Sequence, residues 1–314
     1  MQIIHLHQIK DALAEIDMNQ AMEDAFAAYS AGRAVVPPVG ELLLEKGEVH
    51  IKYGYIKKKE FFVIKIASGF YENAALGLSS GNGLMLLFKQ ETGEIAAILL
   101  DEGHLTDVRT AAAGAVAAKY CAPKNVERIG IVGTGVQGRL QLLHLKAVTT
   151  CRDVLVWGRG DDQIAQYKEE MTEHGFKVET TRDAAEILAS CNLIVTTTPS
   201  KTPLLDGNSI VEGTHITAVG SDTSKKQELD SMILARANLV VADSISQCLE
   251  RGEIYKALSA GVIEEDSVVE LGDIIAGKSD GRLNDSQITV ADLTGVAVQD
   301  IKIAEAVYRK LGTR

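Results

Sequence analysis

The sequence predicts an α/β protein in which a doubly wound parallel sheet is joined to a second, α+β lobe. Two observations support this prediction. From residue 127 onward, short apolar runs alternate with helical segments, which is the pattern of buried parallel strands. Before residue 101, strand-like runs follow one another and only turn signals separate them. A chain of 314 residues is also too long for one small core.

The first lobe is expected to begin with a helix and to continue as a sheet. Apolar residues recur at near-helical spacing over residues 9–31, before Pro37 and Pro38 interrupt the chain. Thr106 is expected to cap a helix that runs to about Tyr120. Strands are predicted at residues 41–44, 49–55, 61–70, 83–89 and 95–101.

The second lobe contains the parallel strands, which are predicted at residues 129–133, 154–157, 193–197, 215–219 and 239–242. A last helix, at residues 290–310, is expected to return to the first lobe. We therefore place the first lobe at residues 1–120 together with about 291–314, and the second lobe at residues 121–290.

A strand, a Gly-x-Gly-x-x-Gly turn and a helix follow one another from residue 128. Gly133 permits the tight turn, Gly135 lets the backbone approach phosphates, and Gly138 lets the helix pack close to the strand. The helix N-terminus favours an anion. This order predicts a Rossmann-type domain that binds NAD(P)(H), rather than a plain glycine-rich turn.

The form of the cofactor is read from the end of the next strand. Arg159 is suited to a 2′-phosphate, which slightly favours NADP, whereas Asp161 or Asp162 would suit the ribose hydroxyl of NAD. Both forms stay open at this point.

Three cationic residues of the first lobe are candidates for anion binding. Arg109 is expected in the first turn of the helix that Thr106 caps, where it would suit a carboxylate, or it is a surface arginine. Lys65 lies in an apolar strand, where burial would lower its pKa, or it is an edge-strand lysine that points outward. Lys52 has the same two interpretations.

Two strand ends of the second lobe carry polar residues. Asp222 would face the ligand crevice or cap the next helix. Thr196, Thr197 and Thr198 end another strand in a similar position.

Composition excludes several classes of function. A net charge of −11 argues against a nucleic-acid partner. No apolar run reaches the length of a membrane span, and the first residues do not resemble a signal peptide. The four cysteines lack metal or disulfide spacing, and the histidines form no metal motif. We expect a cytoplasmic protein without a metal.

Taken together, these residues resemble the ornithine cyclodeaminase/μ-crystallin family. The specific segments are residues 64–70 around Lys65, 105–113 around Arg109, 133–138, 196–200 and 220–222. Residues 70–114 resemble a subgroup that includes iminosuccinate reductases and ectoine-utilisation cyclodeaminases. The resemblance implies hydride transfer between a nicotinamide and the Cα of an amino or imino acid, and a homodimer formed through the first lobe.

The resemblance also implies residue roles. Lys65 and Arg109 should hold the substrate carboxylate, and Asp222 should stand beside the nicotinamide and handle the substrate nitrogen, so Lys65 and Asp222 are the catalytic candidates. The expected cofactor-binding residues are Thr110, Gly133, Thr134, Gly135, Val136, Gln137, Gly138, Arg159, Thr196, Thr197, Thr198, Val219, Gly220 and Ser221.

Two departures from the ornithine cyclodeaminases favour a different substrate. The arginine that follows a proline in those enzymes is missing after Pro38, and Lys52 stands where they carry a carboxylate for a distal ammonium. A lysine repels that ammonium and suits a second carboxylate. We therefore expect reduction of a small imino acid, of ketimine or iminosuccinate type, to an L-amino acid. The alternatives are cyclodeamination of ornithine or a related diamino acid, and a non-catalytic binding protein like μ-crystallin.

Overall fold

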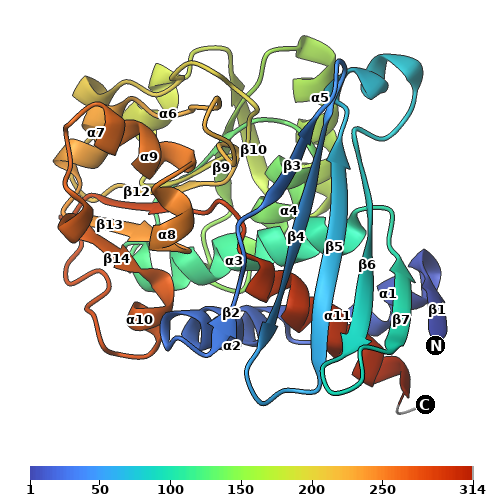
Figure 1. The fold of residues 1–314 in the computed structure, drawn as a ribbon. Helices are drawn as coiled ribbons and strands as arrows, with labels where there is room; N and C mark the ends of the chain where they lie inside the picture. Colours follow the sequence, from blue (N-terminus) through green and yellow to red (C-terminus); the bar gives the residue numbers. More distant parts are fainter. Residues whose placement is uncertain (313–314) are drawn as a thin grey trace. The chain divides into compact units, whose positions relative to one another are not determined.

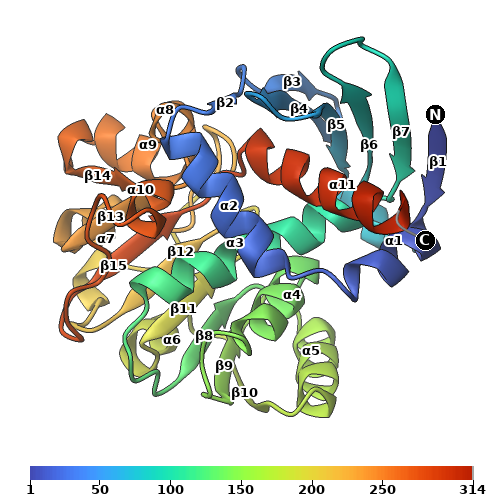
Figure 2. The same ribbon diagram turned by 90° about the horizontal axis from the view of Figure 1, so that it is seen from below.

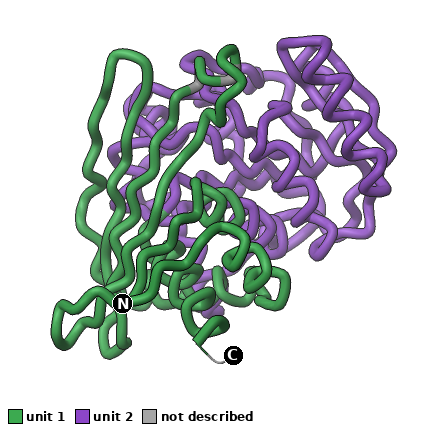
Figure 3. The backbone as a smooth tube through the Cα atoms, turned by 90° about the vertical axis from the view of Figure 1, so that its right-hand side faces the viewer, with its two compact units in different colours: residues 1–109, 296–314 green, residues 110–295 purple. Residues whose placement is uncertain are grey.

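A computed structural model describes residues 1–312 of the chain, which form two compact units (Figure 3). Unit 1 consists of Met1–Arg109 and the segment from Val296 onward, and unit 2 is Thr110–Gly295. The sequence analysis placed the divisions near residues 120 and 290. The first division instead falls inside the helix α3 (His104–Cys121), which continues unbroken from one unit into the other.

Unit 1 begins with β1 (Gln2–His5), α1 (Leu6–Leu13) and α2 (Met18–Ser30). The single helix predicted over residues 9–31 is therefore wrong. The chain breaks because Asp17 caps α2, where its carboxylate accepts a hydrogen bond from the backbone N–H of Gln20 at 3.1 Å. The strands that follow are β2 (Ala34–Val35), β3 (Gly40–Leu43), β4 (Glu48–Ile56), β5 (Phe61–Gly69), β6 (Gly81–Lys89) and β7 (Ile95–Leu100), with a short 3₁₀ segment, η1 (Tyr71–Leu76), between β5 and β6.

These strands form one sheet in the order β1-β7-β6-β5-β4-β2, with β3 also paired to β4 (Figure 1). All pairs are antiparallel except β1 with β7. The helix α11 (Ala297–Gly312) packs against β4, β5 and β6 on one face of this sheet (Figure 2). The predicted start of this helix at residue 290 is wrong, because Thr289–Asp292 forms a fully buried strand and Gly295, with φ of 81°, follows it.

Residues along β4 alternate between two environments. His50, Lys52 and Ile56 are buried on the face that α11 covers, whereas the side chains of Ile51, Tyr53 and Tyr55 are each more than one third exposed on the other face. This alternation is the period-2 pattern of a strand that is covered on one side. It places His50 and Lys52 on the buried face and apolar or aromatic residues on the outer face, which is unusual for a strand covered on one side.

Unit 2 holds eight parallel strands in the order β10-β9-β8-β11-β12-β15-β13-β14. Its strands are β8 (Ile129–Val132), β9 (Asp153–Trp157), β10 (Lys177–Thr181), β11 (Leu193–Thr196), β12 (His215–Ala218), β13 (Leu239–Ala242), β14 (Val268–Glu270) and β15 (Thr289–Asp292). Its helices after α3 are α4 (Val136–Leu145), α5 (Asp161–Glu173), α6 (Ala185–Ser190), α7 (Ser231–Arg236), α8 (Ile245–Cys248), α9 (Gly252–Ser259) and α10 (Leu271–Ile275), with 3₁₀ segments η2 (Gly207–Ser209) and η3 (Glu265–Ser267).

Helices lie on both sides of this sheet, with α4 and α5 on one side and α6, α7 and α9 on the other (Figure 2). The predicted fold class, a doubly wound parallel sheet with a second α+β lobe, is confirmed. The core between the sheet and α6, α7 and α9 is built from branched apolar residues such as Ile194, Ile216 and Val290. None of the helices in residues 1–312 has both the length and the apolar character that a membrane span requires.

Candidate active site

The glycine turn of unit 2 connects β8 to α4. Gly133 has φ of 118°, a conformation that favours glycine. A Cβ at Gly138 would lie 2.2 Å from the carbonyl oxygen of Gly133, so this position has no room for a side chain. A Cβ at Gly135, in contrast, would meet no atom within 4 Å. The space beside Gly135 is therefore open to a ligand.

The N-terminus of α4 is suited to an anion. Its N-cap residue is Gly135, which has no side chain that could cap the first turn. The first N–H groups of a ten-residue helix are thus left for a ligand, with the positive end of the helix dipole behind them.

A pocket opens at the carboxyl ends of three neighbouring strands in unit 2. The chain runs outward from β8 to β9 and β10 and then crosses back to β11 on the other side of β8. This reversal of strand order is the switch point where nucleotides bind in such sheets. The pocket is lined by Gly133, Thr134, Gly135, Trp157, Gly158, Arg159, Gly160, Gln163, Thr197, Thr198 and Pro199.

Six of the residues predicted to bind the cofactor line this pocket, namely Gly133, Thr134, Gly135, Arg159, Thr197 and Thr198. The others are not among its lining residues. Thr196, Val219 and Ser221 are buried, and Gly220 is half-buried. Val136 is 57% exposed, Gly138 lies beneath the turn, and Thr110 and Gln137 contact Gln141 through their oxygen atoms.

Arg159 and the two neighbouring aspartates differ in their surroundings. Arg159 is exposed and lines the pocket, whereas the carboxylate of Asp161 pairs with the guanidinium of Arg182 at 2.5 Å. Asp161 and Asp162 lie in the first turn of α5, where a carboxylate interacts favourably with the helix N-terminus.

Arg139 supports the glycine turn and was not identified from the sequence. Its guanidinium donates to the carbonyl groups of Thr134 and Gly135, and its Nε lies 2.6 Å from a carboxylate oxygen of Glu170. The side chain thereby holds the backbone of the turn in place, while its ion pair with Glu170 offsets its positive charge. The position of Arg139 directly after Gly138 was the feature of the sequence that could have indicated this role.

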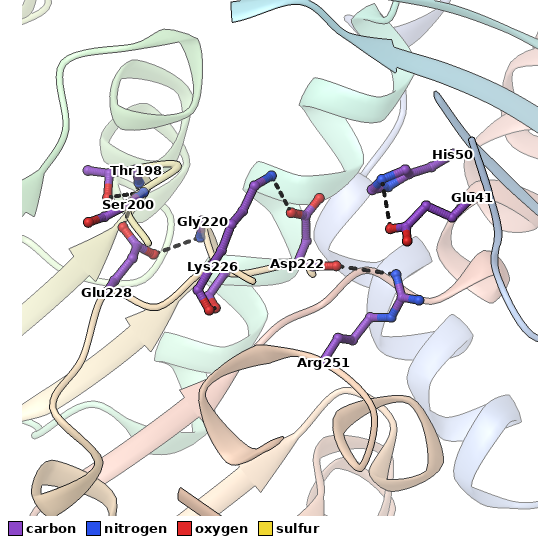
Figure 4. A network of polar contacts seen from close by, with 10 residues as sticks. Glu41, His50, Thr198, Ser200, Gly220, Asp222, Lys226, Glu228 and Arg251 are labelled. Carbon is purple, nitrogen blue, oxygen red and sulfur yellow. Dashed lines mark hydrogen bonds and ion pairs between the residues drawn. The ribbon is translucent and has the colours of Figure 1, made fainter. Parts of the chain in front are cut away.

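Asp222 follows β12 in unit 2. Its Oδ1 lies 2.7 Å from the ammonium nitrogen of Lys226, and its carbonyl accepts a hydrogen bond from Arg251 at 3.3 Å (Figure 4). The alternative that Asp222 caps the next helix is wrong, because Asp230 caps α7. Lys226 has a buried side chain, and the sequence analysis did not identify it.

Lys65 and Lys52 are both buried, with 2% and 5% of their surfaces exposed. The edge-strand interpretation of Lys65 is wrong, because β5 lies between β4 and β6. Lys52 and Lys65 are directly opposite each other on neighbouring strands. Like charges in that arrangement are destabilising, so the pair requires compensation.

Asp300, on α11 of the same unit, supplies this compensation. One of its carboxylate oxygens lies 3.1 Å from the Lys65 ammonium and 3.1 Å from Nε of Arg109. Gln299 accepts a hydrogen bond from the Arg109 guanidinium at 2.6 Å. Lys65, Arg109 and Asp300 are all buried, so two cations and one carboxylate share a site with little water.

Arg109 does not lie in the first turn of its helix, as the sequence analysis expected. The helix α3 begins at His104, and Asp101 accepts the hydrogen bond from the Leu105 N–H at 2.9 Å, so Thr106 is not the N-cap. The ion pair with Asp300, rather than a helix end, holds Arg109 in place.

Burial lowers the pKa of Lys65 to about 7, and the positive charges of Arg109 and Lys52 contribute in the same direction. Asp300 opposes this shift by its negative charge and its hydrogen bond. A lysine with this pKa is able to exchange a proton near neutral pH and, when charged, to bind a carboxylate.

Asp300 and Gln299 were not predicted from the sequence. The signal was two polar residues inside the otherwise apolar segment 297–301, because a buried carboxylate requires a cationic partner. Within residues 1–312, the structure brings together no group of three histidine, cysteine or carboxylate side chains that would hold a metal ion.

The model of the ornithine cyclodeaminase/mu-crystallin family matches residues 2–313. The chain belongs to this family. The resemblance drawn from the sequence is thus confirmed over nearly the whole chain.

The family members that are similar to this chain are named for different reactions. An uncharacterized cyclodeaminase of Sinorhizobium fredii is 42% identical over 305 residues, which cover 96% of this chain and 92% of that protein. The structure of an archaeal alanine dehydrogenase dimer with bound NAD is 34% identical, with a TM-score of 0.91, and the match covers 100% of this chain and 96% of that one.

Two reductases are also similar. The Δ1-pyrroline-2-carboxylate reductase of Thermococcus litoralis, solved with NADH and L-proline, is 30% identical with a TM-score of 0.92, and the match covers 100% of this chain and 98% of that one. The iminosuccinate reductase of Paracoccus denitrificans, solved with NAD⁺, is 30% identical with a TM-score of 0.87, and the match covers 100% and 97%. The family relatives thus act on C–N bonds of small amino or imino acids.

Proposed function

We propose that this protein is an NAD(P)H-dependent reductase that converts a small imino acid to an L-amino acid. The observation that carries the proposal is the buried pair of Lys65 and Arg109 on Asp300 in unit 1, with the buried Lys52 directly opposite Lys65 on the neighbouring strand. Basic side chains gathered in one buried place favour an anionic substrate over one with a distal ammonium.

Each residue has a proposed role. Arg109 and Lys65 bind the α-carboxylate, and Lys52 suits a second carboxylate, as in an imine of iminosuccinate type. Asp222, which Lys226 holds in place, handles the proton at the substrate nitrogen.

The residues of the pocket in unit 2 fit a nicotinamide dinucleotide. The open helix N-terminus at Gly135 suits the pyrophosphate, and Arg159 suits a 2′-phosphate, so we propose that NADPH is accepted and slightly preferred. When bound, the nicotinamide supplies the hydride for Cα.

We also propose that the protein is a homodimer that forms through unit 1. The outer face of the unit 1 sheet carries exposed Ile51, Tyr53 and Tyr55, and apolar patches of this kind mark interaction surfaces. A related archaeal alanine dehydrogenase is a dimer.

The decisive experiment offers the purified protein a panel of cyclic imino acids and of 2-oxo acids with ammonia, each with NADH and with NADPH. Stoichiometric oxidation of the cofactor with formation of an amino acid is expected. Arg109→Ala should lower kcat/KM by about tenfold to hundredfold, because it loses a charge-assisted bond to the carboxylate. Lys59→Ala, which removes an exposed lysine, serves as the matched control.

Cyclodeamination is the second candidate, because the relative at 42% identity is named a cyclodeaminase. Ornithine with a catalytic amount of NAD⁺ tests it. Formation of proline and ammonia without net reduction of the cofactor would establish the cyclodeaminase in place of the reductase.

A further inference from the structure

Glu228 is a buried carboxylate that none of the roles above uses. It is 0% exposed, and three donors at the ends of two neighbouring strands, or just after them, bind it. Its Oε1 accepts from the Thr198 N–H at 2.5 Å, and its Oε2 accepts from the Gly220 N–H at 2.9 Å (Figure 4). The hydroxyl of Thr196 also donates to Oε2, at 2.8 Å.

The two loops follow neighbouring parallel strands and therefore leave the same edge of the sheet. The loop after β11 contains Thr197, Thr198 and Pro199, which line the nucleotide pocket. The loop after β12 begins with Val219 and Gly220 and reaches Asp222 two residues later. A single carboxylate thus joins the wall of the nucleotide pocket to the segment that carries the proposed proton-handling residue.

Gly220 shows how tightly the loops meet. A Cβ at this position would lie 2.2 Å from the carbonyl oxygen of Thr198 and 2.6 Å from Oε2 of Glu228. Glu228 is itself fixed, because its N–H donates to Glu253 at 2.7 Å and its carbonyl accepts from the Leu204 N–H at 2.7 Å. These contacts leave little room for the two loops to move relative to each other.

The chemistry of the contacts suits a carboxylate. All three partners donate hydrogen bonds, so both side-chain atoms of residue 228 that they meet must be acceptors. Burial raises the pKa of Glu228 to about 7, so the fold keeps a group whose charge is costly here. Glutamine has the same shape, but its NH₂ group would face another donor.

We propose that Glu228 is a positioning residue that sets the placement of Asp222 relative to the nucleotide pocket. The inference rests on the proposed function for the role of Asp222. The effect of Glu228 on the wall of the pocket, and so on cofactor binding, does not depend on which reaction is catalysed.

The test uses the full-length protein and Glu228→Gln. Trp157 is the only tryptophan and lines the pocket, so quenching of its fluorescence by NADPH or NADH reports binding without turnover. We expect a cofactor Kd that is raised by roughly tenfold and a kcat that falls by roughly tenfold to hundredfold, because a buried donor loses its acceptor. The KM for the imino acid should change by less than about threefold, since its carboxylate is held by residues of unit 1.

Glu270→Gln is the matched control. Glu270 is a half-buried glutamate at the end of β14, an edge strand of this sheet, and its carboxylate accepts a hydrogen bond from the Ile245 N–H at 3.1 Å. This variant should bind the cofactor and turn over nearly as the wild type does. Should Glu228→Gln fail to fold, Thr196→Val removes one donor from the cluster and should weaken cofactor binding in the same direction, by a smaller factor.

Two outcomes would overturn the inference. One is a Glu228→Gln protein whose cofactor Kd and kcat both stay within about twofold of the wild type. The other is an equal loss in Glu270→Gln, which would show a general effect of such substitutions on stability. A wild-type protein that binds NAD(P)H but reduces no imine would refute the proposed function, and the binding arm would still decide the role of Glu228.

Discussion

Lys65 connects the buried site to the stability of the fold. Its pKa is lowered to about 7 in the folded protein, chiefly by burial, from 10.5 in the unfolded chain. Between these two pH values the unfolded chain binds more protons at this residue, so its contribution makes the protein more stable as the pH rises. The site therefore imposes a stability cost near neutral pH.

We predict that Lys65→Met changes the pH dependence of the free energy of unfolding. The wild type should gain stability relative to this variant as the pH rises from about 7 to about 10, because the cost of burying the ammonium disappears. Urea unfolding at several pH values measures the difference. Lys59→Met alters an exposed lysine and should leave the profile unchanged; a parallel profile for Lys65→Met would contradict the lowered pKa.

Lys52 is the residue that we expect to determine the substrate side chain. Lys52→Glu would place a carboxylate opposite Lys65 and should shift activity from dicarboxylic imines toward substrates with a distal ammonium, by roughly tenfold or more in relative kcat/KM. Lys52→Met separates loss of charge from reversal of charge. If all three proteins share one substrate preference, Lys52 does not contribute to specificity.

The sequence was sufficient to single out Lys65, Arg109 and Asp222 but not their partners. Each stands out because a charge lies at a strand end, in an apolar strand or in a motif. Asp300, Lys226 and Glu228 are recognised only by their contacts. The contact of Asp300 with Lys65 spans most of the chain, and Glu228 contacts two separate loops. No spacing in the sequence predicts that residue 300 contacts residue 65.

Among the elements, the turn from β8 into α4 is the part most fully determined by local sequence. We predict that Gly135→Val weakens NAD(P)H binding by about tenfold or more, because the new side chain would fill space that is open to the pyrophosphate. Since a Cβ at this position meets no protein atom within 4 Å, the variant should fold normally. Quenching of Trp157 fluorescence measures the affinity.

Gly138→Val provides the contrast. Its Cβ would collide with the carbonyl oxygen of Gly133 at 2.2 Å, so this variant should lose thermal stability as well as binding. Equal cofactor affinity in the wild type and in a folded Gly135→Val protein would exclude this turn as the phosphate site.

Element boundaries were predicted well where turn signals are strong and poorly where one pattern runs into another. The strands that were predicted lie within a few residues of their predicted positions, whereas β1 and β2 of unit 1 were not predicted. The helix predicted over residues 290–310 is present as α11, but its predicted start is too early, because the short apolar run around Val290 is compatible with a buried strand as well as with a helix. The strands β10, β14 and β15 were missed, and they complete the sheet.

For the whole molecule, we predict a dimer or larger assembly at micromolar concentration. The exposed apolar residues on the outer face of the unit 1 sheet would be covered in the assembly. Sedimentation velocity of the wild type and of Tyr53→Glu tests this, with Lys59→Glu as a control on an exposed turn. A wild-type monomer would refute the homodimer, and a Tyr53→Glu protein that remains fully assembled would place the interface elsewhere.

Unit 1 is assembled from the two ends of the chain, so its parts are synthesised at different times. The strand that carries Lys65 leaves the ribosome long before α11, which carries Asp300 and covers the sheet. All of unit 2 is translated in between, so it is free to fold first, whereas the nascent sheet lacks its covering helix. The N-terminal third of the protein must therefore wait for the last residues, and we expect it to be the part that depends on chaperones while translation proceeds.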